Sequence, residues 1–266
     1  MKVVVCVKQV PDTKGGVKFK PDGTLDRAAM LTIMNPDDKA GLEAALRLKD
    51  QYGAEVSVVT MGLPKAADVL IEALAMGADK GYLVTDRVLG GADTWATSST
   101  IAGAIRNLDY DLIITGRQAI DGDTAQVGPQ ISEHLGIPVI SYAEGITVDE
   151  AAGTVTVKRQ FEDRYHMVEA KMPCLITALS ELNEPRYMTP GGILDAITNQ
   201  SEKITTWGRA DLKDVEDSNL GLKGSPTQIA KASDKVKKGA GEKVVPESAE
   251  AAVDYIFGKL AEKHVI

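Results

Sequence analysis

A glycine-punctuated stretch at 116–128 has the residue types of a nucleotide site. It follows an apolar run at 111–115 and leads into a pattern of apolar residues four apart, which is typical of a helix. A loop that opens a helix offers unpaired N–H groups and the positive end of the helix dipole, and glycine lets a ligand approach the backbone. Asp121 and Asp123 suit ribose hydroxyls, so we expect adenosine here.

Two other helix starts can share the ligand. The helix expected from Thr94, after Gly90-Gly91, begins with several hydroxyl residues and suits a pyrophosphate, although a plain polar first turn is an alternative. The helix opened by Asn35-Pro36-Asp37-Asp38 carries two acids, which would repel a phosphate. It suits a neutral base or a ribose, or it is only a capped helix.

Catalytic and metal-binding constellations are missing from the sequence. The three histidines, at 134, 166 and 264, have no metal-ligand spacing among themselves or with the cysteines. No GxSxG, Walker or GxGxxG motif occurs. We therefore expect no catalytic residue and no metal, so that any chemistry belongs to a bound cofactor.

Alternating apolar runs and helical patterns predict the scaffold. The expected strands are at 3–7, 56–61, 81–85 and 111–115, and the expected helices centre on 42–46, 69–74 and 101–108. This alternation predicts an α/β fold with a doubly wound, mostly parallel sheet, Rossmann-like and suited to an adenine nucleotide. Ligands of such sheets bind at the carboxyl ends of the strands, where the candidate loops lie.

The pattern changes after residue 145. Short strands at 146–148 and 154–157 predict a hairpin, and two further strands complete a β extension. We expect the α/β domain to span 1–185 and an irregular, extended arm to span 186–240. A final amphipathic helix is expected within 241–266, and an arm without its own core usually lies on a partner.

Composition limits the function classes. The 266 residues carry a net charge of −8, which argues against nucleic-acid binding. No apolar run approaches the roughly 20 residues of a membrane span. Cys6 and Cys174 lie in apolar strands, where burial is expected, and nothing suggests a disulfide framework. A reducing, cytoplasmic location fits.

Several motifs together resemble the β subunit of electron transfer flavoprotein. They are Val7-Lys8-Gln9-Val10-Pro11-Asp12, Asn35-Pro36, Ala75-Met76-Gly77-Ala78-Asp79, the 116–128 stretch and Asn183-Glu184-Pro185-Arg186-Tyr187. The likeness runs in order over nearly the whole chain. It implies a heterodimer in which a larger α subunit carries one FAD in a mobile domain and is embraced by the C-terminal arm of the β subunit.

The resemblance is to the electron-bifurcating type. In ordinary members the β subunit holds AMP and the heterodimer is a one-electron carrier. In the bifurcating type a second FAD takes the AMP site and is reduced by NADH. The features associated with this type are at 8–12, 90–94 and 121–127, and the small residues at 90–92, 122 and 125 leave room for a dinucleotide.

The resemblance implies roles for individual residues. The adenosine half of the cofactor would contact Cys6, Asn35, Met61, Gly122, Thr124, Ala125, Gln126 and Val127. The pyrophosphate would lie at Asp93, Thr94 and Thr97. The loop Lys8, Gln9, Val10, Pro11 and Asp12 would border the flavin ring and NADH.

The resemblance also implies partners. Within 188–197, Met188, Thr189, Ile193 and Leu194 would dock an acyl-CoA dehydrogenase or a related flavin dehydrogenase, although the segment departs from the leucine-bearing anchor loop of ordinary members. One electron would leave to ferredoxin or flavodoxin, and the other through the α-subunit FAD. Two alternatives stay open, namely an ordinary AMP-binding carrier and a stand-alone nucleotide sensor, against which the long arm argues.

Overall fold

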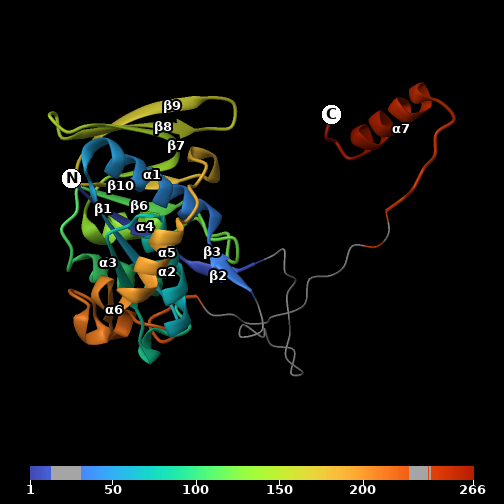
Figure 1. Cartoon of the computed structure of the whole chain (residues 1–266). Helices are drawn as coiled ribbons and strands as arrows, with labels where there is room; N and C mark the ends of the chain where they lie inside the picture. The colour runs from blue at the N-terminus through green and yellow to red at the C-terminus, as the bar shows by residue number, and fades with distance from the viewer. Residues whose placement is uncertain (13–30, 228–238, 240) are drawn as a thin grey trace. The chain divides into compact units, whose positions relative to one another are not determined.

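The computed structural model describes residues 1–12, 31–227, 239 and 241–266. Its main feature is a nine-stranded sheet (Figure 1). In the order of hydrogen bonding the strands are β11 Ile204–Trp207, β5 Lys80–Val84, β4 Glu55–Met61, β1 Lys2–Cys6, β6 Leu112–Gly116, β10 Cys174–Ala178, β7 Val139–Asp149, β8 Thr154–Gln160 and β9 Tyr165–Lys171. The expected mixed α/β fold with a large, mostly parallel sheet is confirmed.

The strand order reverses around β1. The chain first builds outward through β4 and β5, then crosses to the other side of β1 and adds β6. Both neighbours of β1 run parallel to it. The loops that leave β1 and β6 therefore start side by side at the carboxyl edge, which is where open α/β sheets bind ligands.

Strand β7 joins the parallel part of the sheet to the expected β extension. Its first half pairs parallel with β10, and its second half pairs antiparallel with β8, which pairs antiparallel with β9. Register shifts in both of its pairings mark the change of direction. The hairpin predicted between 146–148 and 154–157 is confirmed.

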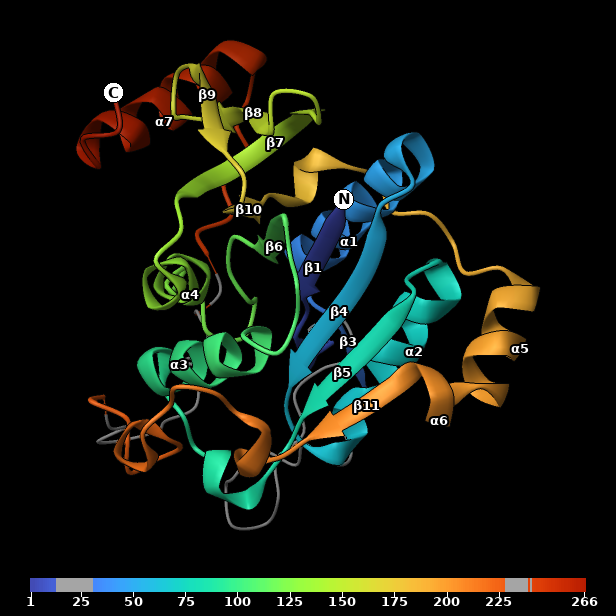
Figure 2. The same ribbon diagram turned by 90° about the vertical axis from the view of Figure 1, so that its left-hand side faces the viewer.

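Helices cover both faces of the parallel strands, as Figure 2 shows. Alternate residues of β1 point to opposite faces, so Val3 and Val5 pack in one core and Val4 and Cys6 in the other. The first core includes apolar side chains of α1 Pro36–Tyr52 and α2 Ala67–Met76, and the second includes those of α3 Thr94–Ile105 and α4 Val127–Leu135. The apolar spacing of these helices is therefore a core signal.

The segment after residue 185 differs from the expected irregular arm. It forms α5 Pro190–Thr198, α6 Gln200–Lys203 and strand β11, which pairs parallel with β5 at the edge of the sheet. The following stretch buries Leu212, Val215 and Leu220 in the second core. The compact unit therefore runs from Met1 to Gln228 instead of ending at 185.

The reason for the difference is that the glycines of this region allow close packing. Gly192 of α5 leaves no space for a Cβ, which would lie 2.5 Å from the Ala75 oxygen of α2. Gly221 adopts φ +56° and approaches the Val88 oxygen. The remainder of the expected arm, at 228–238 and 240, lies outside the described residues.

The structure of residues 8–12 also differs from the expected loop. Strand β2 Gln9–Pro11 pairs antiparallel with β3 Thr32–Met34 in a small separate sheet. Val10 is completely buried there. Short 3-10 turns occupy Pro64–Ala66, Arg87–Leu89, Ser180–Leu182, Arg209–Asp211 and Asp217–Asn219.

The C-terminal unit contains one helix among its described residues. Helix α7 Ala249–Glu262 is the helix expected near the end of the chain, and Ser248 caps it by accepting a hydrogen bond from the Ala251 N–H. Val253, Ile256 and Phe257 are exposed on it. Within the described ranges, no helix has both the length and the apolar character needed to cross a membrane.

Candidate functional site

Two predicted ligand loops meet at the carboxyl edge of the sheet. The Lys8 ammonium, just after β1, lies 2.7 and 2.8 Å from the two carboxylate oxygens of Asp121, in the loop after β6. Both side chains keep contact with solvent. The ion pair therefore spans the point where the strand order reverses, between elements that are 113 positions apart.

The loop at 117–126 has the conformation of a binding loop. Asp123 and Ala125 adopt positive φ angles of 50° and 54°, which are uncommon for residues with a side chain. Such conformations collect at functional sites. Around Gly122 nothing lies within 4 Å of the position a Cβ would take, so this part of the loop is open. The space expected at residue 122 is thus present.

The start of α4 is an available anion-binding end. Gln126 occupies the N-cap position without a side-chain capping hydrogen bond, and the first turn holds no acid. Gly128 in that turn is tightly packed, because a Cβ there would lie 2.6 Å from the Thr115 hydroxyl. Because no side chain caps this helix start, its first N–H groups are candidates to bind an anionic ligand.

The start of α3 is already capped. The Asp93 carboxylate accepts hydrogen bonds from the Ala96 N–H at 3.0 Å and from the Thr227 N–H at 2.9 Å. The Thr94 hydroxyl donates to the Gln126 amide oxygen at 2.8 Å. The structure therefore brings the residues predicted for pyrophosphate next to the loop predicted for adenosine, while Asp93 itself serves as a helix cap.

The small residues at 90–92 do not leave the expected space. Gly91 has φ +75°, and a Cβ on it would lie 3.1 Å from Leu222. The Leu222 N–H also donates to the Gly90 oxygen at 3.0 Å, and the Asp93 N–H donates to the Ser225 hydroxyl at 2.8 Å. The segment around Leu222 fills the room beside Gly91, because these glycines let the same chain approach.

The first turn of α1 binds the backbone of both ligand loops. Asn35 is completely buried, and its side chain accepts from the Ile120 N–H at 3.1 Å and donates to the Gln118 oxygen at 2.8 Å. It makes no capping hydrogen bond with its own helix. The sequence favoured a ribose site or a helix cap here. In the structure the Asn35 side chain instead binds the backbone of the loop after β6.

Asp38 lies in the same turn and is 6% exposed. Its two carboxylate oxygens accept from the Lys8 N–H at 2.8 Å and the Gly116 N–H at 2.9 Å. Burial raises the pKa of this carboxyl to about 7, although hydrogen bonds to the charged form oppose the shift. Gly116 must be glycine, since a Cβ would lie 2.2 Å from the nearer Asp38 oxygen.

The remaining predicted cofactor residues lie at strand ends on the same edge. Cys6 ends β1 and Met61 ends β4. Burial raises the pKa of the Cys6 thiol to about 12, so it stays protonated at neutral pH. Cys6 and Cys174 are both buried free thiols, as the sequence indicated.

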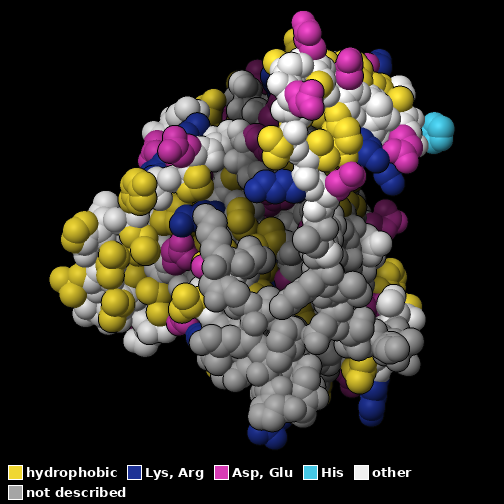
Figure 3. All heavy atoms as spheres, turned by 90° about the vertical axis from the view of Figure 1, so that its right-hand side faces the viewer, with side chains coloured by type: hydrophobic (Ala, Val, Ile, Leu, Met, Phe, Trp, Pro, Cys, Tyr) yellow, Lys and Arg dark blue, Asp and Glu magenta, His cyan; other side chains and the backbone are white. Residues whose placement is uncertain are grey.

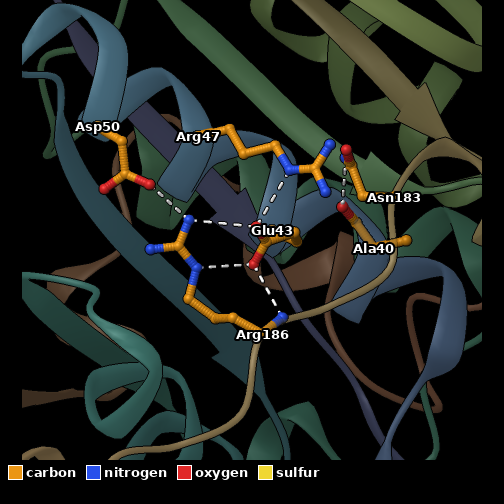
Figure 4. A network of polar contacts seen from close by, with 6 residues as sticks. All are labelled: Ala40, Glu43, Arg47, Asp50, Asn183 and Arg186. Carbon is orange, nitrogen blue, oxygen red and sulfur yellow. Dashed lines mark hydrogen bonds and ion pairs between the residues drawn. The ribbon is translucent and has the colours of Figure 1, made fainter.

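A salt-bridge network fixes the chain where it leaves the main sheet (Figure 4). Arg186 donates from Nε at 2.9 Å and from Nη2 at 3.1 Å to the Glu43 carboxylate of α1, and from Nη2 to Asp50 at 2.7 Å. The Glu43 side chain is only 5% exposed. Asn183 adds a 3.3 Å bond to the Ala40 oxygen. The Asn183–Tyr187 motif thus attaches this segment to α1.

The predicted docking residues lie around α5. Met188, Ile193 and Leu194 are exposed, and Figure 3 shows hydrophobic side chains gathered at the left of the view, over this helix. The Thr189 hydroxyl instead accepts from the Gly192 N–H at 3.0 Å and caps the helix. Of the predicted docking residues, the other three therefore contribute apolar surface.

Comparisons with known proteins agree with this arrangement. The electron transfer flavoprotein domain model matches residues 22–212. The chain belongs to the electron transfer flavoprotein β-subunit family. It is 52% identical over 267 residues to the electron transfer flavoprotein subunit beta of Clostridium acetobutylicum, with both chains fully covered.

Two further relatives carry the names of reductases. The caffeyl-CoA reductase-Etf complex subunit CarD of Acetobacterium woodii is 47% identical over 269 residues. The acryloyl-CoA reductase electron transfer subunit gamma of Anaerotignum propionicum is 48% identical over 273 residues. Both alignments cover the whole of each chain.

Sequence reasoning missed Glu43, Arg117 and the bracing role of Asp38. Arg117 Nε lies 3.5 Å from Asp37 Oδ2, and neither atom has a hydrogen-bond partner among the described residues. Glu43 shares its face of α1 with Lys39, Arg47 and Asp50, so the spacing indicated only an ordinary charged helix face. Its partner lies 143 residues away, so spacing could not identify it.

Proposed function

We propose that this chain is the β subunit of a heterodimeric, electron-bifurcating electron transfer flavoprotein. The reaction begins with hydride transfer from NADH to an FAD held by this subunit. One electron goes to ferredoxin or flavodoxin, and the other passes through the FAD of the α subunit to a dehydrogenase. The main support is that the loops after β1 and β6 meet where the strand order reverses, and that the Lys8–Asp121 ion pair joins them. Open α/β sheets bind their ligands at such a position.

The site fits the adenosine half of the cofactor. Gly122 offers an open approach, and the start of α4 is without a side-chain cap. The carboxylates of Asp121 and Asp123 would bind ribose hydroxyls in competition with the Lys8 ammonium and the Gln118 amide, from which they now accept hydrogen bonds. Thr124, Ala125, Gln126 and Val127 complete this Rossmann-like nucleotide loop. Bound there, FAD supplies two-electron acceptance and one-electron donation, while the chain supplies orientation and electrostatics.

The second half of the cofactor would extend toward α3. Thr94 and Thr97 lie in the first turns of that helix, and the contact between Thr94 and Gln126 puts the two halves of the site within reach of each other. Gln9, Pro11 and Asp12 would border the flavin ring and NADH with Lys8. Val10 would act only through packing, because it is buried.

The relatives support a partner of the acyl-CoA class. Two of them are named for complexes with caffeyl-CoA reductase and acryloyl-CoA reductase. An acyl-CoA dehydrogenase or a related flavin dehydrogenase would dock on the exposed apolar side chains of Ile193 and Leu194 in α5 and of Met188 just before it. The α subunit would cover the exposed face of α7, and the complex would work in the cytoplasm.

The ordinary carrier is the alternative, and two observations favour it. Leu222 occupies the room beside Gly91, and Asp93 is already engaged by Ala96 and Thr227. A mononucleotide such as AMP needs none of that space. In this alternative the nucleotide is structural and NADH is not oxidised.

Cofactor counting separates the two functions. The chain is co-expressed with its α subunit, purified as the complex, and its nucleotides are released and quantified. Two FAD per heterodimer and NADH-dependent reduction of ferredoxin are expected. One FAD with one AMP, and no oxidation of NADH, would leave the ordinary carrier as the function.

A further inference from the structure

Asp38 joins the backbones of the two ligand loops through one buried carboxylate. One oxygen accepts from the Lys8 N–H at 2.8 Å and the other from the Gly116 N–H at 2.9 Å. The first N–H group lies two residues after the end of β1 and the second at the end of β6, where the strand order reverses. The length of a single carboxylate therefore helps to set the separation of the loops.

The surrounding contacts strengthen this connection. The Asn35 N–H donates to the Lys8 oxygen at 2.9 Å, and the Asn35 side chain bonds both Gln118 and Ile120. Because Gly116 has no Cβ, the strand end comes close enough to reach the acid. The first turn of α1 is thus a brace between the loops, and Asp38 is the member that touches both strand ends.

We propose that Asp38 is a positioning residue that holds the loops after β1 and β6 at the separation needed for nucleotide binding. This inference rests on the proposed function of the site. Both oxygens of Asp38 are already taken by Lys8 and Gly116, so its effect on a nucleotide is indirect. It acts only while both oxygens can accept a hydrogen bond.

The basic groups around Asp38 are directed elsewhere, and the charge of the neighbouring Asp37 adds to burial in raising the pKa of Asp38. The Lys8 ammonium pairs with Asp121, and Arg117 pairs with Asp37 on the same helix turn. In the parts of the chain that the structure describes, no lysine or arginine lies within ion-pair distance of Asp38, and the nearby Cys6 thiol is protonated at neutral pH. The negative charge is held by hydrogen bonds in a buried place.

A proton on Asp38 would weaken the brace. Protonation turns one oxygen into a donor, which then faces an N–H donor of Lys8 or Gly116. The pKa of this carboxyl, raised to about 7 by burial, places the change near neutral pH. Nucleotide affinity should therefore fall as the pH is lowered through this range.

The test measures binding to the full-length chain. Affinities for AMP and FAD are determined by calorimetry for the wild type and for Asp38→Asn at about pH 8, where the carboxylate is charged. The amide of the variant can accept only one of the two N–H groups, so we expect affinity to fall about tenfold. Asp68→Asn is the matched control, because it removes an exposed acid from the first turn of α2. It should bind as the wild type does.

A pH series makes the test specific. FAD is the probe, because its phosphate groups have no proton to exchange between about pH 6 and about pH 8. The wild-type and Asp68→Asn affinities should fall several-fold toward pH 6, and the Asp38→Asn affinity should stay flat. Should Asp38→Asn fail to fold, the wild-type series decides alone.

Two results would overturn the inference. One is an Asp38→Asn affinity within twofold of the wild type, and the other is a flat wild-type series. Failure of the wild type to bind either AMP or FAD is a different outcome, since it contradicts the proposed function itself and removes the inference with it.

Discussion

The Lys8 ammonium and the Asp121 carboxylate form a two-oxygen contact at 2.7 and 2.8 Å that joins the loops on either side of the reversal of strand order. The Lys8 side chain is 47% exposed and that of Asp121 34% exposed. An ion pair with that much solvent contact contributes little to folding. Its position, however, is at the proposed mouth of the nucleotide site, so the two properties can be separated experimentally.

Removing this pair should affect ligand binding more than stability. We expect Lys8→Met and Asp121→Asn each to change the free energy of unfolding by less than about 1 kcal/mol. The interaction free energy of the two residues, obtained with the double variant, should fall in the same range. The content of bound nucleotide in the purified complex should drop in each variant. Denaturant unfolding and nucleotide release measure the two effects, and unchanged nucleotide content would remove both residues from the site.

Glycine substitutions should separate packing from ligand approach. Gly116→Ala puts a Cβ 2.2 Å from Asp38, so we expect a loss of roughly 1–3 kcal/mol in the free energy of unfolding. Gly122→Ala meets nothing within 4 Å and should unfold like the wild type, but should hold less nucleotide. Chemical denaturation of both variants is the measurement. A stable Gly116→Ala chain would contradict the packing described for that position.

Asp38 should make stability fall as the pH rises. Its folded pKa of about 7 lies above the ordinary value of 3.8, so the unfolded chain loses the proton first. The contribution is complete below the unfolded pKa and is lost as the pH rises through about 7. Between about pH 5 and about pH 8, the free energy of unfolding of the wild type should therefore fall by roughly a few kcal/mol relative to that of Asp38→Asn. Parallel stability curves for the two proteins would refute this assignment.

Arg186 should be worth more to stability than Arg47, although both pair with Glu43. Arg186→Met leaves a carboxylate that is 5% exposed with two fewer hydrogen bonds, and we expect a loss of roughly 1–3 kcal/mol. Arg47 is half exposed and lies one turn along the same helix, so Arg47→Met should cost less than about 0.5 kcal/mol. Urea unfolding of the two variants gives the comparison.

The same pair has the opposite pH dependence to Asp38. Burial disfavours the charge of Glu43, but hydrogen bonds from Arg186 and Arg47 outweigh it and hold the pKa of the carboxyl below its usual range. This contribution is present above the unfolded pKa and is lost on acidification through the folded pKa. The gap between the wild type and Arg186→Met should therefore close in acid. A constant gap would argue against the ion pair as its cause.

The exposed surface of α5 should affect electron transfer to the partner and leave the stability of the fold unchanged. Leu194 is 68% exposed, so Leu194→Lys should leave stability and nucleotide content unchanged while slowing electron transfer to the dehydrogenase. Met167→Lys on β9 is a control of similar exposure, at 60%, outside this surface. The dehydrogenase-coupled rate of each complex is measured at limiting partner concentration. Equal rates in all three proteins would remove α5 as the docking surface.

Much of the scaffold could be predicted because its signals are local. Apolar runs and helical spacing are fixed within a few residues, so most strands and helices up to Ala178 were predictable, whereas the short strands β2 and β3 were not. The loop at 116–128 was predictable as well, since its glycines follow a strand directly. What local patterns could not give is which loops touch, as the contact of Thr94 with Gln126 illustrates.

The errors have a common physical cause. The glycine-rich sequence after residue 185 suggested that this segment has no hydrophobic core. In the structure, however, Gly192, Gly221 and Gly224 allow backbone segments to pack closely. The four residues of β11 are too short for a clear strand pattern, and their partner β5 lies far earlier in the chain. Asp37 and Asp38 resembled ordinary helix-capping acids, because hydrogen bonds to distant loops leave no mark in spacing.

Strand β11 also bears on how the protein is made. Among the described strands it is the last to be synthesised, and it covers the edge of β5, which is completed at Val84. A nascent chain that ends before Trp207 therefore presents that edge uncovered while translation continues. Until β11 emerges from the ribosome, a chaperone or a neighbouring copy can bind the unpaired backbone groups of this edge.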